Sequence, residues 1–247
     1  NPIRDKETID IELQLKDLES LDKKLEKVRK TARTGNKDAQ KEQEVLEKLK
    51  KGLEAAVSIR AIELSEKERE EYVTPLQFIT DKPVLYVCNV DEKSAVNGND
   101  YVAKVKEAVK DENAEVIVLA VGTEADITEL DSFEERQLFL EDLGLQEAGS
   151  SVLIRAAYKL LNLQTYFTAG VKEVRAWTIN IGDTAPQAAG VIHSDFEKGF
   201  IRAEVIAYDD YVKFGSEAKV KEAGKMKVEG KEYIVKDGDV MHFRFNV

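Results

Sequence analysis

The sequence predicts a multidomain α+β protein made of three consecutive parts. Apolar residues follow a three- and four-residue spacing through the first part, which is typical of two paired helices. Two short apolar runs separated by a helical pattern then indicate an α/β domain. Alternating patterns typical of strands fill the remainder. We therefore expect a helical coiled-coil arm at 1–70, part of an α/β domain at 71–162 and a β-rich domain at 163–247.

Composition excludes several classes of protein. The 247 residues are 43% hydrophobic and 34% charged, and the high charged share is typical of long exposed helices. The longest apolar run, near 116–121, is far shorter than the ~20 residues of a membrane-spanning helix, and the first residues do not form a signal peptide. The single cysteine, Cys88, excludes an internal disulfide and fits a reducing cytosol. We expect a cytoplasmic protein without a membrane partner.

The net charge of −11 is unevenly distributed along the chain. Residues 1–60 hold 15 Lys and Arg against 13 Asp and Glu, whereas residues 61–163 hold 10 against 22. The middle of the chain is therefore a poor surface for nucleic acid, and an RNA partner would contact one of the two ends. No DNA specificity is expected.

The first part is predicted to be an antiparallel pair of helices over residues 6–62. The tripeptide Thr34-Gly35-Asn36 interrupts the apolar spacing, because Gly commonly follows a helix end and Asn caps the next helix. The first seam is expected to contain Ile11, Leu15, Leu18, Leu21, Leu25, Val28 and Ala32, and the second Leu46, Leu49, Leu53 and Ala56.

The outer half of this arm is basic, and two interpretations remain open. One is a solvated coiled-coil surface that is stabilised by ion pairs within the helices. The other is a tip that contacts RNA or an acidic partner. The candidate contact residues are Lys23, Lys24, Lys27, Arg29, Lys30, Arg33 and Lys37.

The middle part has the strand–helix alternation of a doubly wound sheet. Buried parallel strands are predicted at 84–88 and 116–120, with a helix at 100–110 between them that carries Val102, Val105 and Val109 on one face. Further helices are predicted at 132–143 and 152–161. Two strands are too few for a complete sheet, so we expect that part of this domain lies outside the chain.

The last part is predicted to be a small β-grasp domain with one or two helices. A hairpin is expected around Ala169-Gly170, and residues 240–245 are expected to close the sheet. Residues 200–207 alternate, which predicts that Ile201, Ala203, Val205 and Ala207 share one face.

Candidate binding residues follow the two strands of the middle part. Asn89-Val90-Asp91-Glu92 comes directly after the first strand, and ligands of open α/β sheets bind beyond the carboxyl ends of strands. The Asn can bond the edge of a purine, and a carboxylate can accept from base N–H groups. After the second strand, Val121 and Gly122 could present main-chain N–H groups to the base, although taken alone an ordinary strand-to-helix turn explains them better.

No phosphate-binding loop, metal site or catalytic group is apparent. Residues 144–150 have the glycine spacing of a Walker-type loop but lack its Lys, and Glu147 would repel phosphates. His193 and His242 lie far apart in the sequence without further metal ligands near them, so structural or surface roles are expected for both.

Several long motifs in the last part are distinctive. They read LQTYFTAG at 163–170, EVRAWT at 173–178, APQAAG at 185–190, HSDFEKGFI at 193–201 and YIVKDGD at 233–239. Together they closely resemble the YchF family of Obg-like ATPases, and the resemblance extends over the whole chain.

The resemblance implies a P-loop GTPase relative that binds ATP, with GTP possible, together with Mg²⁺, and that acts around translation. It also implies that the last part is a TGS domain and that the base is read by an Asn-x-x-Glu motif, here Asn89, Val90, Asp91 and Glu92. The Lys and Asp of the guanine-selective motif are absent at these positions. The family's phosphate loop and magnesium ligands have no counterpart here, so we expect a chain that resembles the C-terminal two-thirds of a member.

Two hypotheses about function follow. In the first, the chain is the base-reading portion of a ribosome-associated ATP- or GTP-hydrolysing protein and does not hydrolyse nucleotide alone. In the second, the arm and the TGS domain form a non-catalytic module that binds RNA or the ribosome.

Overall fold

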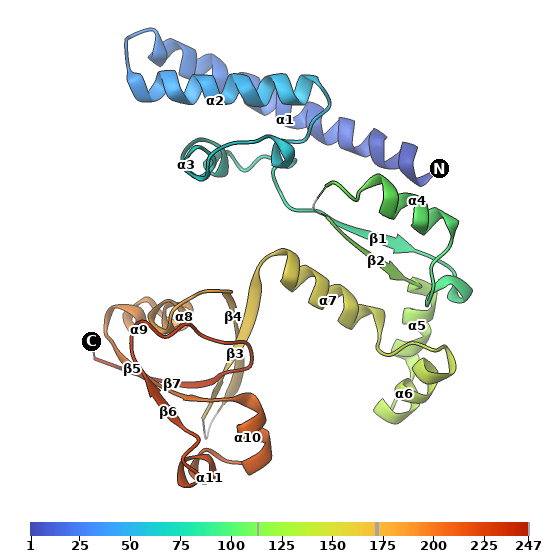
Figure 1. Cartoon of the computed structure of the whole chain (residues 1–247), viewed down its shortest axis with the longest axis vertical. Helices are drawn as coiled ribbons and strands as arrows, with labels where there is room; N and C mark the ends of the chain where they lie inside the picture. Colours follow the sequence, from blue (N-terminus) through green and yellow to red (C-terminus); the bar gives the residue numbers. More distant parts are fainter. Residues whose placement is uncertain (113, 171–172, 247) are drawn as a thin grey trace. The chain divides into compact units, whose positions relative to one another are not determined.

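The computed structural model describes residues 1–112, 114–170 and 173–246, which form two units, Asn1–Ala156 and Ala157–Val247 (Figure 1). The first unit contains a pair of long helices and a small α/β part. The second is a five-stranded sheet with short helices. Each unit is described separately below.

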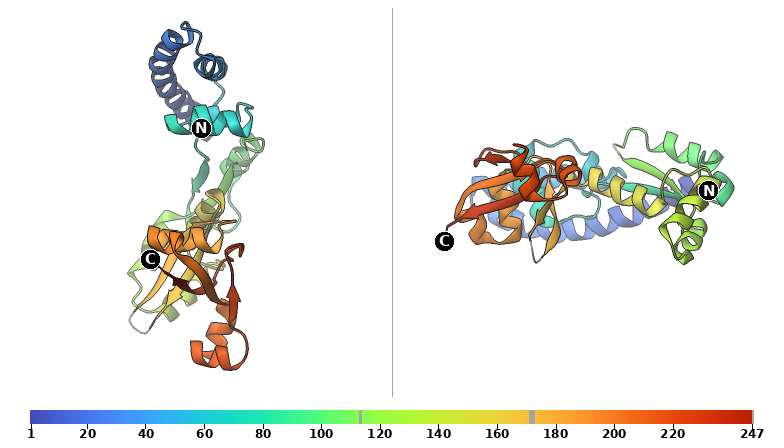
Figure 2. Two further views of the ribbon diagram at one scale, coloured as in Figure 1. Left: turned by 90° about the vertical axis from the view of Figure 1, so that its left-hand side faces the viewer. Right: turned by 90° about the horizontal axis from the view of Figure 1, so that it is seen from below.

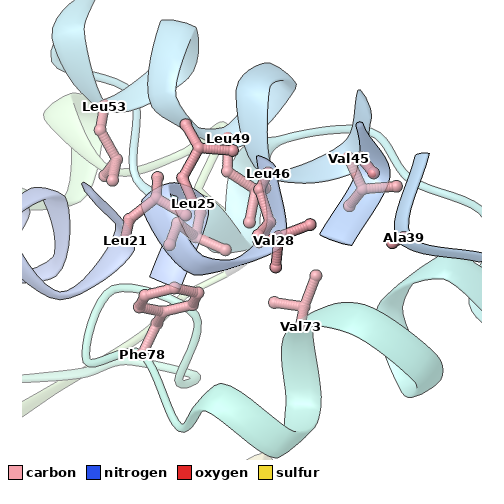
Figure 3. Packing of buried hydrophobic residues seen from close by; sticks show 12 residues of the cluster. Leu21, Leu25, Val28, Ala39, Val45, Leu46, Leu49, Leu53, Val73 and Phe78 are labelled. Carbon is pink, nitrogen blue, oxygen red and sulfur yellow. The ribbon is translucent and has the colours of Figure 1, made fainter. Parts of the chain in front are cut away.

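The first unit begins with the predicted helix pair, α1 (Pro2–Ala32) and α2 (Lys37–Glu54). The Asn36 side chain accepts a hydrogen bond from Ala39 N–H and caps α2, as expected for Asn at this position. Leucines from both helices meet in the core, where Leu21, Leu25, Leu46 and Leu49 are almost completely buried (Figure 3).

The predicted seam of α1 is wrong near its beginning. Ile11 and Leu15 are 49% and 59% exposed, whereas Gln14 and Asp17 are buried. The reason is the difference in helix length: α1 has 31 residues and α2 has 18, so the first turns of α1 extend past their partner. The first half of α1 contacts residues that follow α2 in the sequence, and these contacts are polar: Gln14 and Asp17 form hydrogen bonds there.

The segment between α2 and the first strand folds back onto the helix pair, which the sequence did not predict. It contains η1 (Ile59–Ala61), α3 (Glu66–Glu68), the π-helical turn η2 (Arg69–Val73) and η3 (Thr74–Leu76). Ile59, Val73 and Phe78 are fully or almost fully buried in the same core as the leucines, and Figure 3 shows Val73 and Phe78 pointing at the two helices.

The α/β part follows the predicted order closely. Strands β1 (Leu85–Asn89) and β2 (Glu115–Leu119) form a parallel pair in register from Leu85↔Glu115 to Asn89↔Leu119. Helix α4 (Asp100–Ala108) connects them, and Val102 and Val105 on it and Val109 at its C-cap are buried, as predicted. After η4 (Glu92–Ser94) and β2, three helices complete the part: α5 (Val121–Glu129), α6 (Phe133–Asp142) and α7 (Gly149–Leu160). Of these, α5 was not predicted.

The second unit is a mixed sheet in the order β4-β3-β7-β5-β6. The predicted hairpin is β3 (Leu163–Ala169) with β4 (Val174–Asn180), and β7 (Val240–Phe245) runs parallel to β3. Strands β5 (Phe200–Ile206) and β6 (Lys227–Glu229) form the other side. Helices α8 (Ala185–Ile192) and α9 (Ser194–Lys198) pack beside one core cluster, and α10 (Tyr208–Phe214) and α11 (Glu217–Glu222) beside another (Figures 1 and 2).

Two predictions for this unit are wrong. Its described residues after β3 form four short helices in place of one or two, because α10 and α11 were not recognised. In β5, Ala203 and Val205 are buried as predicted, but Ile201 is 56% exposed and Ala207 is exposed, whereas Phe200 and Ile206 are buried. The register with β7 shifts between Phe200 and Arg202, which changes the alternation, and Ile206 joins the second cluster.

In the part of the chain that the structure describes, no helix is both long and apolar enough to cross a membrane.

Candidate nucleotide-base site

The two predicted loops meet at one edge of the parallel strand pair. Because Asn89 is in register with Leu119, both strands end at the same level. The Asn89 side-chain oxygen accepts a hydrogen bond of 3.1 Å from Val121 N–H, and Val90 N–H donates to the Leu119 carbonyl at 2.8 Å. The Asn side chain therefore fastens the second loop to the first, and its amide N–H₂ group remains on the exposed edge.

The other residues of the first loop have separate roles. The Asp91 carboxylate accepts from Ser94 N–H at 3.1 Å and caps the short helix η4. Glu92 is exposed, and among the described residues its carboxylate has no hydrogen-bond or ion-pair partner. Glu92 thus remains available as an acceptor, whereas Asp91 is used locally.

The second loop is the first turn of α5. Val121 and Gly122 are exposed, and a Cβ atom added at Gly122 would meet nothing within 4 Å. N–H groups in the first turn of a helix have no partner within the helix. The site is therefore an open edge with main-chain donors from α5 and side-chain groups from Asn89 and Glu92.

Glu124 is a further residue of this site, and no local sequence pattern indicates its role. Its carboxylate accepts from Gly149 N–H at 2.6 Å and from Ser150 N–H at 3.1 Å, so it caps α7 although Glu124 and Gly149 are 25 residues apart in the sequence. A Cβ at Gly149 would lie 2.5 Å from Leu119 Cδ2, so only Gly permits this approach. The second glycine of residues 144–150 therefore serves this contact, and the N–H groups of Gly149 and Ser150, which could approach a phosphate, already hold a carboxylate.

The candidate cations of the arm divide into two groups. Lys23, Lys24 and Arg29 form ion pairs with Glu19, Glu42 and Glu47 at 2.6, 2.7 and 3.2 Å. The other four are exposed and have no ion-pair partner among the described residues: Lys27, Lys30, Arg33 and Lys37. They lie in the last two turns of α1, at its C-cap and at the first residue of α2, and we refer to them as the tip cations.

The histidines have separate positions in the second unit. His193 Nδ1 accepts from Asp195 N–H at 3.2 Å and caps α9, whereas His242 is exposed on β7. Among the residues that the structure describes, no group of three His, Cys, Asp or Glu side chains could hold a metal ion.

Comparisons with known proteins give a consistent result. The family model YchF-GTPase_C, described as a protein of unknown function (DUF933), matches residues 163–246. The ribosome-binding ATPase YchF of Bacillus subtilis is 53% identical over the whole chain, which covers 68% of that relative. The protein of the same name from Escherichia coli O157:H7 is also 53% identical, with 67% of its length covered.

A solved structure agrees with this match. The structure of the Schizosaccharomyces pombe YchF GTPase superimposes with a TM-score of 0.85 at 36% identity, over 99% of this chain and 66% of that one. Fold and site geometry thus define a mixed α/β protein of the GTPase-like class. The sequence identities assign it more closely: the chain belongs to the YchF family.

Proposed function

We propose that this chain supplies the base-contacting side of an ATP site, with GTP as the alternative nucleotide, in a cytoplasmic protein that binds the ribosome through its arm. The hydrogen bond between Asn89 and Val121 N–H is the observation on which the nucleotide part rests, since it holds two strand-end loops together on an exposed edge. The relatives' name, ribosome-binding ATPase, supports both halves of the proposal.

The base would be read by groups of both polarities. Asn89 offers its side-chain N–H₂, Glu92 offers a carboxylate acceptor, and Gly122 offers a main-chain N–H. The N–H groups of Val90 and Val121 already donate to Leu119 and Asn89, so these two residues would contribute apolar contact beside the base. Purine edges present both acceptors and N–H donors, so this mixture suits them. The motif has Val and Glu where the guanine-selective pattern has Lys and Asp, which supports preference for adenine or relaxed recognition.

The 247 residues alone are not expected to hydrolyse nucleotide. The sequence contains no run of the form GxxxxGK[ST], which supplies the N–H groups, the Lys and the magnesium hydroxyl of a phosphate site. The charge of the triphosphate must be neutralised before a phosphoryl group can be transferred. A chain without this phosphate-binding run should therefore show no turnover and make only weak contacts with the base.

The test uses fluorescent ATP with this chain, together with phosphate release in Mg²⁺. We expect no turnover, and binding no tighter than about millimolar, which corresponds to ~4 kcal/mol. Asn89→Ala should remove the residual binding, whereas Asp195→Ala in the other unit should not. Micromolar affinity for ATP would contradict the proposal, because it would require a phosphate site in this chain.

The arm would contact ribosomal RNA through the tip cations. Unpaired Lys and Arg side chains can neutralise phosphates without first breaking an ion pair, so Lys27, Lys30, Arg33 and Lys37 are better placed than Lys23, Lys24 and Arg29. Reversing all four to Glu should weaken co-sedimentation with ribosomes, most strongly at low salt. The matched control reverses Lys104, Lys106, Lys219 and Lys221, which lie outside the arm.

If the control reduces ribosome binding as much as the tip variant, the contact is nonspecific and the arm is only a scaffold. The second hypothesis, a ribosome-binding module without nucleotide, predicts the same tip effect. The two hypotheses differ in the effect of Asn89→Ala. If the module binds no nucleotide, this substitution should leave the ATP-binding measurement unchanged.

The predicted division into a coiled-coil arm (1–70), a partial P-loop nucleotide domain (71–162) and a TGS β-grasp domain (163–247) is part of this proposal. The hairpin β3–β4, followed by α8 and by β7 parallel to β3, supports the β-grasp assignment. Expression of 163–247 alone is the test, since a true domain should unfold cooperatively.

A further inference from the structure

Two neighbouring strands of the second unit separate along their length. β3 and β7 are paired at one position, Phe167↔Val240, although β3 continues to Ala169 and β7 to Phe245. A groove of about 470 Å³ opens where they separate. The groove is therefore bounded by a strand of the sheet interior, β7, and not by an outer edge.

The free side of β7 in this groove is a row of main-chain groups. Phe167 N–H donates to the Asp239 carbonyl at 2.8 Å, so odd-numbered positions of β7 direct their main chain towards β3. The same alternation directs the N–H and C=O of Phe243 into the groove. Among the described residues, no strand pairing covers Phe243 on this side. A row of unpaired N–H and C=O groups along a strand is a template for pairing with another chain, so the position favours a further strand.

Aromatic side chains line the same groove. The rings of Phe196 and Phe245 stack with centroids 3.8 Å apart, and Trp177 stands on the hairpin side. The Trp177 indole N–H donates to the Thr168 hydroxyl at 2.9 Å, so its one polar atom is already bonded. These walls offer apolar surface to a side chain that enters between them.

The charge of the groove distinguishes between a peptide and RNA. Among the described lining residues, Glu173 is the one carboxylate, and none is Lys or Arg. The nearby Arg175 guanidinium lies over the Trp177 ring at 4.1 Å. RNA phosphates require cations for binding, whereas a carboxylate suits a basic side chain. The lining thus favours an apolar peptide that carries a Lys or Arg.

We propose that the second unit binds an extended peptide of apolar residues with a basic residue as an added strand along β7, in the groove between β3 and β7. Main-chain hydrogen bonds to Phe243 would supply affinity, and the pocket between Trp177 and Phe245 would select alternate apolar side chains. This site is independent of the nucleotide and ribosome contacts proposed above.

The probe is a fluorescein-labelled heptapeptide of alternating Lys and Val, added to the whole chain. Its matched control has methyl groups on the main-chain nitrogens of alternate residues, which removes strand hydrogen bonds and keeps the side chains. We expect saturable binding, with NMR shifts at the amides of Ala169, Met241 and Phe243. The methylated peptide should bind about tenfold more weakly, as expected for the loss of one or two hydrogen bonds.

Two variants locate the site. Glu173→Lys changes an exposed side chain, so the protein should stay folded while affinity for the probe falls by about tenfold or less. Val228→Ala alters β6, an outer strand of the same sheet, and should leave affinity unchanged.

Several results would overturn the proposal. One is equal binding of the methylated peptide, and another is a set of shifts confined to β4 or β6. Strong protection of the Phe243 amide from exchange in the free protein would show that β3 and β7 are fully paired and the groove is closed. Tighter binding of an oligouridylate than of the peptide at these amides would assign the groove to RNA.

Discussion

The carboxylate of Asp17 accepts main-chain hydrogen bonds from Ile79 at 2.9 Å and from Thr80 at 2.7 Å, 62 and 63 residues further along the chain. Asp17 is 2% exposed and lies on α1, at the level where α2 no longer covers it. Thr80 in turn accepts from Ile59 N–H through its hydroxyl. One buried carboxylate therefore joins the long helix to the chain that enters β1.

Asp17→Ala should strongly destabilise the first unit. The substitution leaves the buried N–H of Thr80 and the partly buried N–H of Ile79 without an acceptor, and hydrogen bonds to charged groups contribute about 1.5–3 kcal/mol each. We expect a loss of about 2–4 kcal/mol in the free energy of unfolding by urea. Asp5→Ala is the control, because that side chain is 63% exposed and should matter little. Equal stability of the two variants would mean that water replaces the lost acceptor.

A second network ties the start of α1 to the α/β part. Lys6 Nζ lies 2.7 Å from both Asp10 and Glu112, and the Tyr86 hydroxyl donates to Glu112 at 2.7 Å. Burial alone would lower the pKa of Lys6, but the bonds to Asp10 and Glu112 outweigh it and the pKa is raised. Burial would likewise raise the pKa of Glu112, and the bonds from Lys6 and Tyr86 reverse this and lower it.

Glu112→Gln should therefore remove a pH-dependent part of stability. A carboxyl group whose pKa is lowered by folding stabilises the protein above its unfolded pKa of about 4.3, and this contribution is lost as the pH falls through the folded value. Wild type should exceed the variant by about 1 kcal/mol at pH 7, and the difference should shrink below pH 4. Urea titrations at several pH values measure this. A difference independent of pH would assign the effect to packing.

Gly149→Ala should destabilise the protein although Ala is the better helix former. The new Cβ would lie 2.5 Å from Leu119 Cδ2 and 2.9 Å from Glu124 Oε1, and such overpacking costs about 1–3 kcal/mol. Gly122→Ala is the matched control, because it also lies in the first turn of a helix and its Cβ meets open space. Thermal unfolding should separate the two, with the control unchanged or slightly more stable. Similar behaviour of both would show that α7 shifts easily.

The sequence was sufficient to predict contacts that follow from a local pattern of residues. Parallel strands end at a common edge, so the meeting of Asn89 with Val121 could be predicted from two apolar runs and the helix between them. The contact of Glu124 with Gly149 could not, because nothing local to either residue indicates its partner. Asp17 shows the same limit: nothing near it in the sequence indicates that residues 79–80 return to it and bury it. In β5, one register shift was enough to expose Ile201.

Ala56→Gly should stabilise the first unit. Ala56 follows α2 with a φ of +58°, in the left-handed region where a Cβ costs roughly 1 kcal/mol and where Gly commonly ends a helix. Its side chain is exposed, so no packing is lost, and we expect a net gain of about 0.5 kcal/mol after the greater chain entropy of Gly in the unfolded state. The control is Ala55→Gly, one residue earlier at φ −91°, where only the entropic cost applies and stability should fall. Thermal and urea unfolding should show that Ala56→Gly raises stability and Ala55→Gly lowers it. A change of the same sign in both variants would show that Ala56 leaves the left-handed conformation in solution.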